Sequence, residues 1–309
     1  MLIPARPYLF GNDERRGFGV KMAFCELSNR AVVRISGEEA HHFLQGLVTN
    51  DMAAVDEQGA GFGALLTPQG KILFDFLIAR DSDGYLFDTP KATVADLVKR
   101  FSFYKLRAKV EVANLSDSHM VVAFWDAETA PDVAGTVFAD PRHAGLGYRA
   151  IVERAGFAPA GDTADVDAYT AHRVAIGVPE AGVDFDYGEV FPHDVDMDFL
   201  AGLSFAKGCF VGQEVVSRMQ HRGTARRRVV KASAQADLPA PGTAITAGEK
   251  TIGSLGSVAG TDGLALVRID RAKTAMDAGT PLLSGDAELT LSIPDWAGFG
   301  WPGADAESA

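Results

Sequence analysis

Residues 203–223 read LSFAKGCFVGQEVVSRMQHRG and form the most informative stretch of the 309-residue chain. Gly208 and Gly212 flank Cys209, and glycine lets the backbone approach a ligand closely or adopt a positive φ. Apolar residues then recur at helical spacing, which predicts a helix that begins near Gly212. Cys209 would precede the N-terminus of this helix, beside Lys207, where the thiolate is favoured over the thiol. A small buried cysteine without reactivity is the alternative.

A run of basic residues follows the cysteine. His221 and five arginines lie between residues 218 and 228 with no acid among them, namely Arg218, Arg222, Arg226, Arg227 and Arg228. Because arginine binds carboxylate or phosphate through two parallel hydrogen bonds, the run predicts an anion site for a glutamate tail, a phosphate or an RNA backbone. A solvated face, with Glu214 and Arg218 paired along the helix, is the alternative.

A predicted hairpin upstream supplies a candidate acid. GFGALL (61–66) and KILFDFLIAR (71–80) flank a tight turn at residues 67–70. Alternate side chains share a face of a strand, so Asp75 is set among leucines. A buried carboxylate is costly without a partner, and such sites are often functional. A sheet edge at which Asp75 reaches water or an arginine is the alternative.

The remaining pattern predicts an α+β protein. We expect a strand over 31–36, a helix capped by Ser36 and Glu39, a second helix opened by Thr89 and Pro90, and a third over 169–178. Short apolar runs between turns predict a small antiparallel barrel near the C-terminus. The predicted organisation is an N-terminal extension (1–21), an α+β region of two interleaved subdomains (22–228), the barrel (229–300) and a disordered tail (301–309).

Charge, apolar runs and cysteine content disfavour several classes of function. The net charge of −12 disfavours direct binding of nucleic acid. No apolar run is long enough to cross a membrane, and residues 1–21 lack the apolar core of a secretory signal. Two cysteines, Cys25 and Cys209, with no CxxC pair, cannot alone supply the four thiolates of an iron–sulfur cluster. They indicate a reducing compartment, and we expect a cytoplasmic protein.

Several motifs together carry a family resemblance. Residues 207–214 (KGCFVGQE) match the pattern K-G-C-[YF]-x-G-Q-E, and further matching segments follow the same order along the chain: FLQG (43–46), TND (49–51), LTPQGK (66–71), YKLRAKV (104–110), DPR (140–142), RVAIGVP (173–179) and FPHD (191–194). Over residues 22–230 the chain resembles the YgfZ/Caf-type folate-binding iron–sulfur maintenance factors, which are related to the T-protein (aminomethyltransferase) of glycine cleavage.

The resemblance implies a tripartite T-protein-like fold whose central channel holds tetrahydrofolate or a derivative. It implies a role in assembly or repair of clusters in iron–sulfur client enzymes, with cluster-carrier proteins as partners and an indirect effect on tRNA modification. Cys209 would be the key thiol, either a shared cluster ligand or a redox-sensitive group. Asp75 would orient the folate together with loop residues and arginines, namely Lys207, Gly208, Gly212, Gln213, Glu214, Arg173, Arg218 and Arg222.

Two departures weaken the alternative of a true one-carbon transferase. Aminomethyltransferases resemble one another in a tandem Asp-Asp on the hairpin strand, where this chain has Phe74 and Asp75. They also carry a glutamate in a segment where this chain has Ala175. Two further interpretations are a binding module that uses folate only as a structural ligand, and an RNA-binding protein.

Overall fold

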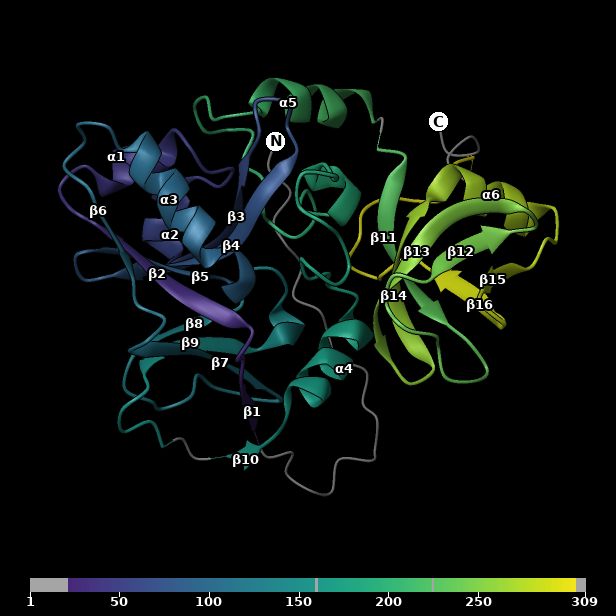
Figure 1. The fold of residues 1–309 in the computed structure, drawn as a ribbon, viewed down its shortest axis with the longest axis horizontal. Coiled ribbons are helices and arrows are strands. Elements are labelled where there is room, and N and C mark those ends of the chain that lie inside the picture. The colour runs from purple at the N-terminus through teal and green to yellow at the C-terminus, as the bar shows by residue number, and fades with distance from the viewer. Residues whose placement is uncertain (1–21, 159–160, 224, 304–309) are drawn as a thin grey trace.

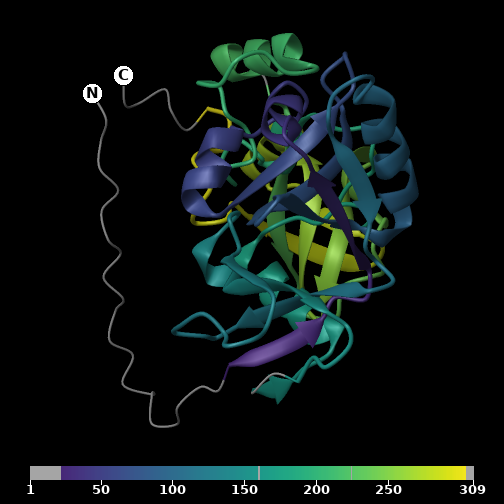
Figure 2. The same cartoon turned by 90° about the vertical axis from the view of Figure 1, so that its left-hand side faces the viewer.

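The computed structural model describes residues 22–158, 161–223 and 225–303. Figures 1 and 2 show a helix-covered sheet and a barrel at opposite ends of the long axis, with a second sheet beside the first. The predicted extension at 1–21 and residues 304–309 of the predicted tail lie outside the described residues. Within the described residues, no helix has the length and apolar character that crossing a membrane requires.

The first sheet is antiparallel and carries its helices on one face. Its strand order is β3-β4-β5-β2-β6. Alternate strand residues and the apolar faces of the helices share one core, which includes Leu44, Phe76 and Phe101. The elements are β2 (Arg30–Ser36), α1 (Ala40–Gln45), α2 (Met52–Gln58), β3 (Ala60–Leu66), β4 (Ile72–Asp81), β5 (Gly84–Pro90), the 3-10 turn η1 (Lys91–Thr93), α3 (Val94–Tyr104) and β6 (Glu111–Asn114).

The second sheet has the strand order β10-β1-β7-β9-β8. Its inner face, the other face of the first sheet and residues of the barrel share a second core, which includes Leu77, Val121 and Val229. The elements are β1 (Ala23–Glu26), β7 (His119–Trp125), β8 (Thr136–Ala139), η2 (Ala144–Leu146), β9 (Tyr148–Glu153), β10 (Asp162–Thr163), α4 (Val166–Ile176), η3 (Pro192–Val195) and α5 (Gln213–Arg222).

The C-terminal unit is a closed antiparallel barrel, as predicted, with the strand order β11-β14-β13-β12-β15-β16. A helix that the sequence analysis missed, α6, contacts β14 and β15. The elements are β11 (Arg227–Ser233), β12 (Ala244–Ala247), β13 (Lys250–Ala259), β14 (Asp262–Arg268), α6 (Ile269–Asp277), β15 (Leu282–Ser284) and β16 (Ala287–Ser292).

Two predicted helix starts are wrong. Ser36 ends β2, and α1 begins only at Ala40 with Glu39 as a cap residue that makes no side-chain cap bond. The carboxylate of Glu39 instead accepts a hydrogen bond from the backbone N–H of Lys109 at 2.6 Å. Thr89 does not cap α3, because it lies in β5 opposite Ala31. In both places, strand pairing occupies residues that look like caps in the sequence.

Candidate functional site

Asp75 lies in the interior, on the face of β4 opposite the helices. The hydroxyl of Tyr187 donates a short hydrogen bond to its Oδ1. Burial raises the pKa of Asp75, and the charge of Arg30 and the bond from Tyr187 offset this only in part. Its Oδ2 accepts no hydrogen bond from the residues that the structure describes. A carboxylate oxygen without a donor can accept hydrogen bonds from a ligand that brings N–H groups.

A chain of buried ion pairs lies around Asp75. Arg30 donates to Asp88 at 2.5 Å, and Arg149 donates to the other oxygen of Asp88 at 2.7 Å. Arg149 also reaches Asp140 at 3.2 Å, and Asp140 accepts from Arg142 at 2.7 Å. Burial alone would raise the pKa of Asp140, but the two arginines outweigh it and lower that pKa to about 2. These groups come from both sheets, so the charges tie the sheets together.

Arg173, predicted to bind the cofactor, connects this region to the barrel. Its guanidinium donates to Asp184 at 2.9 Å and to the hydroxyl of Ser257 in β13 at 2.5 Å. Glu180 lies 3.4 Å from its Nε. With 1% of its surface exposed, Arg173 is held by protein groups. The geometry therefore favours a structural role, with the folate assignment for Arg173 left as a prediction.

The loop before α5 presents Cys209 on the surface. As predicted, α5 begins next to Gly212, at Gln213. Lys207 is not a free cation beside the thiol, because its Nζ donates to the carbonyls of Val48 and Asn50, both at 2.6 Å. Burial lowers the pKa of Lys207 to about 8. Lys207 therefore anchors the loop to the turn between α1 and α2.

Gly212 and Gln213 fix the loop from its other end. Gly212 has a φ of +81°, and a Cβ there would stand 2.5 Å from the carbonyl oxygen of Thr67 in the β3–β4 turn. Only glycine fits this close approach. The side-chain oxygen of Gln213 accepts from the backbone N–H of Phe210 at 3.1 Å. At Gly208, by contrast, a Cβ would meet no atom within 4 Å. These residues shape the loop, and none of these contacts involves Asp75.

The structure places the two predicted key residues in different surroundings. Cys209 lines a surface groove of about 560 Å³ with Pro68, Gly212 and Ser217. Asp75 lies three residues after Ile72, the first residue of β4, which places it roughly 10 Å along the strand from its start. Figure 1 shows α5 across the end of β3 and β4 that carries the turn. The thiol therefore lies near the β3–β4 turn, whereas the carboxylate lies further along β4 in the interior.

Three of the five arginines of the predicted anion site are paired with acids of the chain itself. Arg227 donates to Asp194 at 2.7 Å, and Arg228 donates to Asp198 at 2.7 Å. Arg218 pairs with Glu214 at 2.8 Å on the exposed face of α5. The acids that neutralise Arg227 and Arg228 come from residues 194–198, which the local sequence window did not include. The side chain of Arg222 lies outside the described residues.

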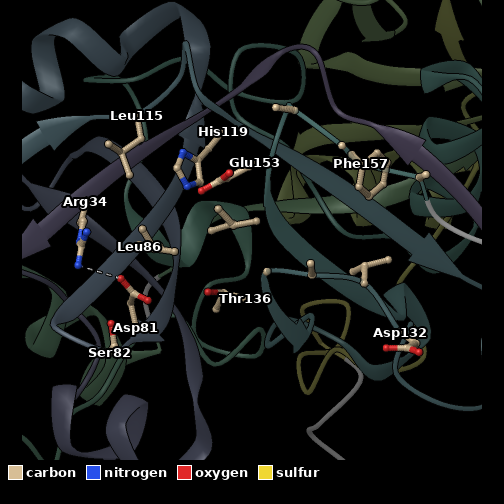
Figure 3. Close-up of a pocket in the computed structure, with 17 residues that line it drawn as sticks. Arg34, Asp81, Ser82, Leu86, Leu115, His119, Asp132, Thr136, Glu153 and Phe157 are labelled. Carbon is tan, nitrogen blue, oxygen red and sulfur yellow. Dashed lines mark ion pairs between the residues drawn. The ribbon is translucent and has the colours of Figure 1, made fainter.

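A further cavity, of about 730 Å³, lies between the two sheets (Figure 3). Arg34 and Asp81 from the first sheet face His119 and Glu153 from the second across it. None of the residues predicted as functional from the sequence lines this cavity.

Sequence reasoning missed the partners of Asp75. Tyr187 stands 112 positions away along the chain, and nothing in its local sequence marks it. The segment DPR (140–142) was the one sequence signal for the buried ion pairs near Asp75, since Asp140 and Arg142 are both buried and paired with each other. Among the described residues, no group of three or more His, Cys, Asp and Glu side chains is arranged to hold a metal ion.

Comparison with known proteins agrees with the fold. Residues 11–153 match the family described as the GCVT N-terminal domain, and residues 226–299 match the family described as the CAF17 C-terminal beta-barrel domain. The crystal structure of the aminomethyltransferase T of the glycine cleavage system from Bartonella henselae superposes with a TM-score of 0.64 at 14% identity, over 89% of this chain and 85% of that one. At this identity the likeness concerns the fold alone.

Curated relatives are more similar in sequence. The mitochondrial iron–sulfur cluster assembly factor IBA57 of Mus musculus is 31% identical over 93% of this chain and 87% of its own. The human protein of that name is 29% identical over 92% of this chain and 86% of its own. The IBA57 homolog of Mycosarcoma maydis is 35% identical over 67% of this chain, which spans only 56% of that relative.

Fold and sequence define an aminomethyltransferase-like protein with a CAF17-type barrel. Within this class, the chain belongs to the IBA57 family of iron–sulfur cluster assembly factors. The relatives are IBA57 proteins rather than specifically YgfZ proteins, within the same wider family. The expected cytoplasmic location is contradicted, because these relatives are mitochondrial proteins. Few cysteines indicate a reducing compartment but do not distinguish one such compartment from another.

Proposed function

We propose that this chain supports iron–sulfur cluster assembly with two separate groups. Tetrahydrofolate or a derivative binds at Asp75, and Cys209 acts as a thiolate toward the cluster of a partner protein. The observation that carries the proposal is the contrast between a buried carboxylate with an oxygen free of donors and an exposed thiol on a clamped loop. Asp75 lies in β4, and the loop that carries Cys209 contacts the β3–β4 turn, so a ligand at one site can reduce the mobility of the other.

The folate site uses charge and shape rather than covalent chemistry. Oδ2 of Asp75 would accept hydrogen bonds from N–H groups of the pterin, while Tyr187 donates to Oδ1 and fixes the plane of the carboxylate. A charged acceptor makes such hydrogen bonds stronger than neutral ones. Tetrahydrofolate, when bound, would supply a one-carbon carrier or a structural ligand. Arg227 and Arg228 are already paired with aspartates, so they are not assigned to the glutamate tail.

Cys209 supplies one ligand to a cluster that the chain handles as cargo. The thiol loses its proton when it binds iron, because the thiolate is the metal ligand. The other ligands come from iron–sulfur client enzymes or cluster-carrier proteins. Any effect on thiolated tRNA would follow from loss of cluster-dependent enzymes. A one-carbon transferase is the alternative, and it is supported by the fold likeness alone.

The test is a calorimetric titration of the purified chain with tetrahydrofolate and with 5-formyl-tetrahydrofolate. Loss of one charge-assisted hydrogen bond predicts that Asp75→Asn weakens binding by about tenfold or more. Cys209→Ser should bind folate like the wild type but fail to restore cluster-enzyme activities in a deletion strain. Full rescue by Cys209→Ser contradicts the thiolate role. Equal folate affinity of Asp75→Asn and wild type contradicts the folate site.

A further inference from the structure

The C-terminal end of α3 forms a basic surface that the proposed function does not use. Residues 99–109 read KRFSFYKLRAK, with five cationic side chains and no acid, in a chain whose net charge is −12. Lys99, Arg100 and Arg107 are exposed. None of these three makes a hydrogen bond or ion pair with the part of the chain that the structure describes. Their charge is therefore free to meet a partner.

Two large apolar side chains stand in the middle of this surface. Phe103 is 69% exposed and Leu106 is 84% exposed, more than any other large apolar residue among those described. Phe103 lies in the last turn of α3, and Leu106 follows the end of the helix at Lys105. Single exposed apolar residues are ordinary, but two residues this exposed, three positions apart in the sequence and amid basic residues, are typical of an interaction surface.

Each of the two side chains borders its own hollow. Phe103 lines a hollow of about 420 Å³ with Phe74, Lys99, Arg100 and Asp96. Leu106 lines a second hollow, of about 330 Å³, in which Phe43 and Leu47 of the α1 region meet Lys105, Arg107 and Glu39. Each hollow combines an apolar floor with an excess of one positive charge over its acids. Such hollows suit the insertion of side chains from another protein.

The backbone at Leu106 is unfavourable for the residue it carries. Leu106 has a φ of +44° and directly follows Lys105, which caps the end of α3. This position of a helix usually carries glycine or asparagine, because other side chains are strained there. Its side chain is almost fully exposed, so packing within the chain does not compensate for the strain. The contacts within the described part of the chain therefore do not account for a leucine at this position.

We propose that this surface, from Lys99 to Lys109, docks an acidic protein segment that inserts apolar side chains beside Phe103 and Leu106. The local positive charge complements acids on the partner. The two separate hollows accept individual side chains, which favours a protein over a flat anionic lipid surface. The surface does not include Cys209 or Asp75, so its test is independent of theirs.

The experiment selects a phage-displayed library of random linear peptides on the immobilised full chain. We expect enriched peptides with Asp or Glu around two or more apolar residues. For a synthetic copy of the most enriched peptide, Leu106→Gly and Arg107→Glu should each weaken binding by about tenfold. Lys250→Glu is the matched control, because it changes the net charge of the chain as Arg107→Glu does but lies on the barrel. The control should leave the affinity unchanged.

Leu106→Gly also separates docking from folding. Glycine relieves the positive φ, so this variant should unfold at a higher urea concentration than the wild type while it loses the peptide. The proposal is overturned if no acidic peptide is enriched, or if Arg107→Glu and Lys250→Glu weaken binding equally. Vesicles containing phosphatidylserine, and a transfer RNA, are tested in parallel. Binding to either that Arg107→Glu abolishes, without acidic peptides, would also overturn it.

Discussion

At the scale of single residues, Asp75 occupies a setting that costs the folded chain free energy whenever it is ionised. Burial removes the carboxylate from water, and Arg30 and Tyr187 compensate only in part, so its pKa is raised. When the pKa of a group is higher in the folded state than in the unfolded state, the protonated group contributes its full stability at a pH below the unfolded pKa. That contribution is lost as the pH rises through the folded pKa.

Asp75→Asn should therefore remove one pH-dependent loss of stability. Asparagine keeps the shape and an acceptor for Tyr187 but carries no charge. We expect the free energy of unfolding of the variant, relative to that of the wild type, to increase as the pH rises above about 4, the ordinary pKa of Asp. Urea unfolding of both proteins between acidic and neutral pH measures this. A difference that stays constant with pH would show that the Asp75 carboxylate does not titrate abnormally.

The two cysteines should differ sharply in reactivity. Cys25 is buried, and burial together with Asp165 and Glu26 raises its pKa to about 11. At pH 8 such a thiol is ionised to only about one part in a thousand, and the thiolate is the reactive form. Cys209 is exposed. Iodoacetamide should label Cys209 in the folded chain and Cys25 only after unfolding in urea, as mass spectrometry of peptides would show. Labelling of both cysteines at similar rates in the folded chain would contradict the structure.

At the scale of elements, the loop that carries Cys209 is held by its contact with the β3–β4 turn. Gly212 lies against Thr67 with a positive φ, whereas Gly208 faces open space. Gly212→Ala should destabilise the chain by about 2 kcal/mol or more, because it combines left-handed strain with a steric clash. Gly208→Ala is the matched control and should change stability by less than about 0.5 kcal/mol. Chemical denaturation measures both, and equal effects would mean that the loop is not clamped at Gly212.

Elements set by local pattern were predictable, and those set by pairing were not. The hairpin around residues 67–70 and the helix after Gly212 follow from turn residues and from spacing that a short window contains. Thr89 looks like a helix cap but lies in β5, because it pairs with β2 more than fifty residues earlier in the chain. The same limit applies to the candidate site. Cys209 was identifiable from its motif, but the acids that neutralise Arg227 and Arg228 were not identifiable as their partners.

At the scale of the whole molecule, buried ion pairs and hydrogen bonds join the two sheets and the barrel. The sheets meet through Arg30, Asp88 and Arg149, and Arg173 carries the connection to Ser257 of the barrel. A linear sequence offers no sign of such pairs, because their members come from segments far apart in the chain. Buried ion pairs add little stability over apolar packing. They fix the relative orientation of the parts that they join, because removing one partner leaves the other as an uncompensated buried charge. They therefore set how the barrel is oriented against the two sheets.

Removal of Arg173 tests this coupling. Arg173→Met keeps an unbranched apolar stem but leaves the buried carboxylate of Asp184 without its cation. We expect a loss of about 3–5 kcal/mol, since an uncompensated buried charge is costly. The barrel should also unfold separately, so that its transition in urea, followed with a fluorophore on the barrel, precedes that of the sheets. Arg218→Ala removes an exposed Arg–Glu pair and should cost less than about 1 kcal/mol. If both variants unfold in one transition with similar losses, the Arg173 cluster does not hold the barrel, and packing alone sets the domain arrangement.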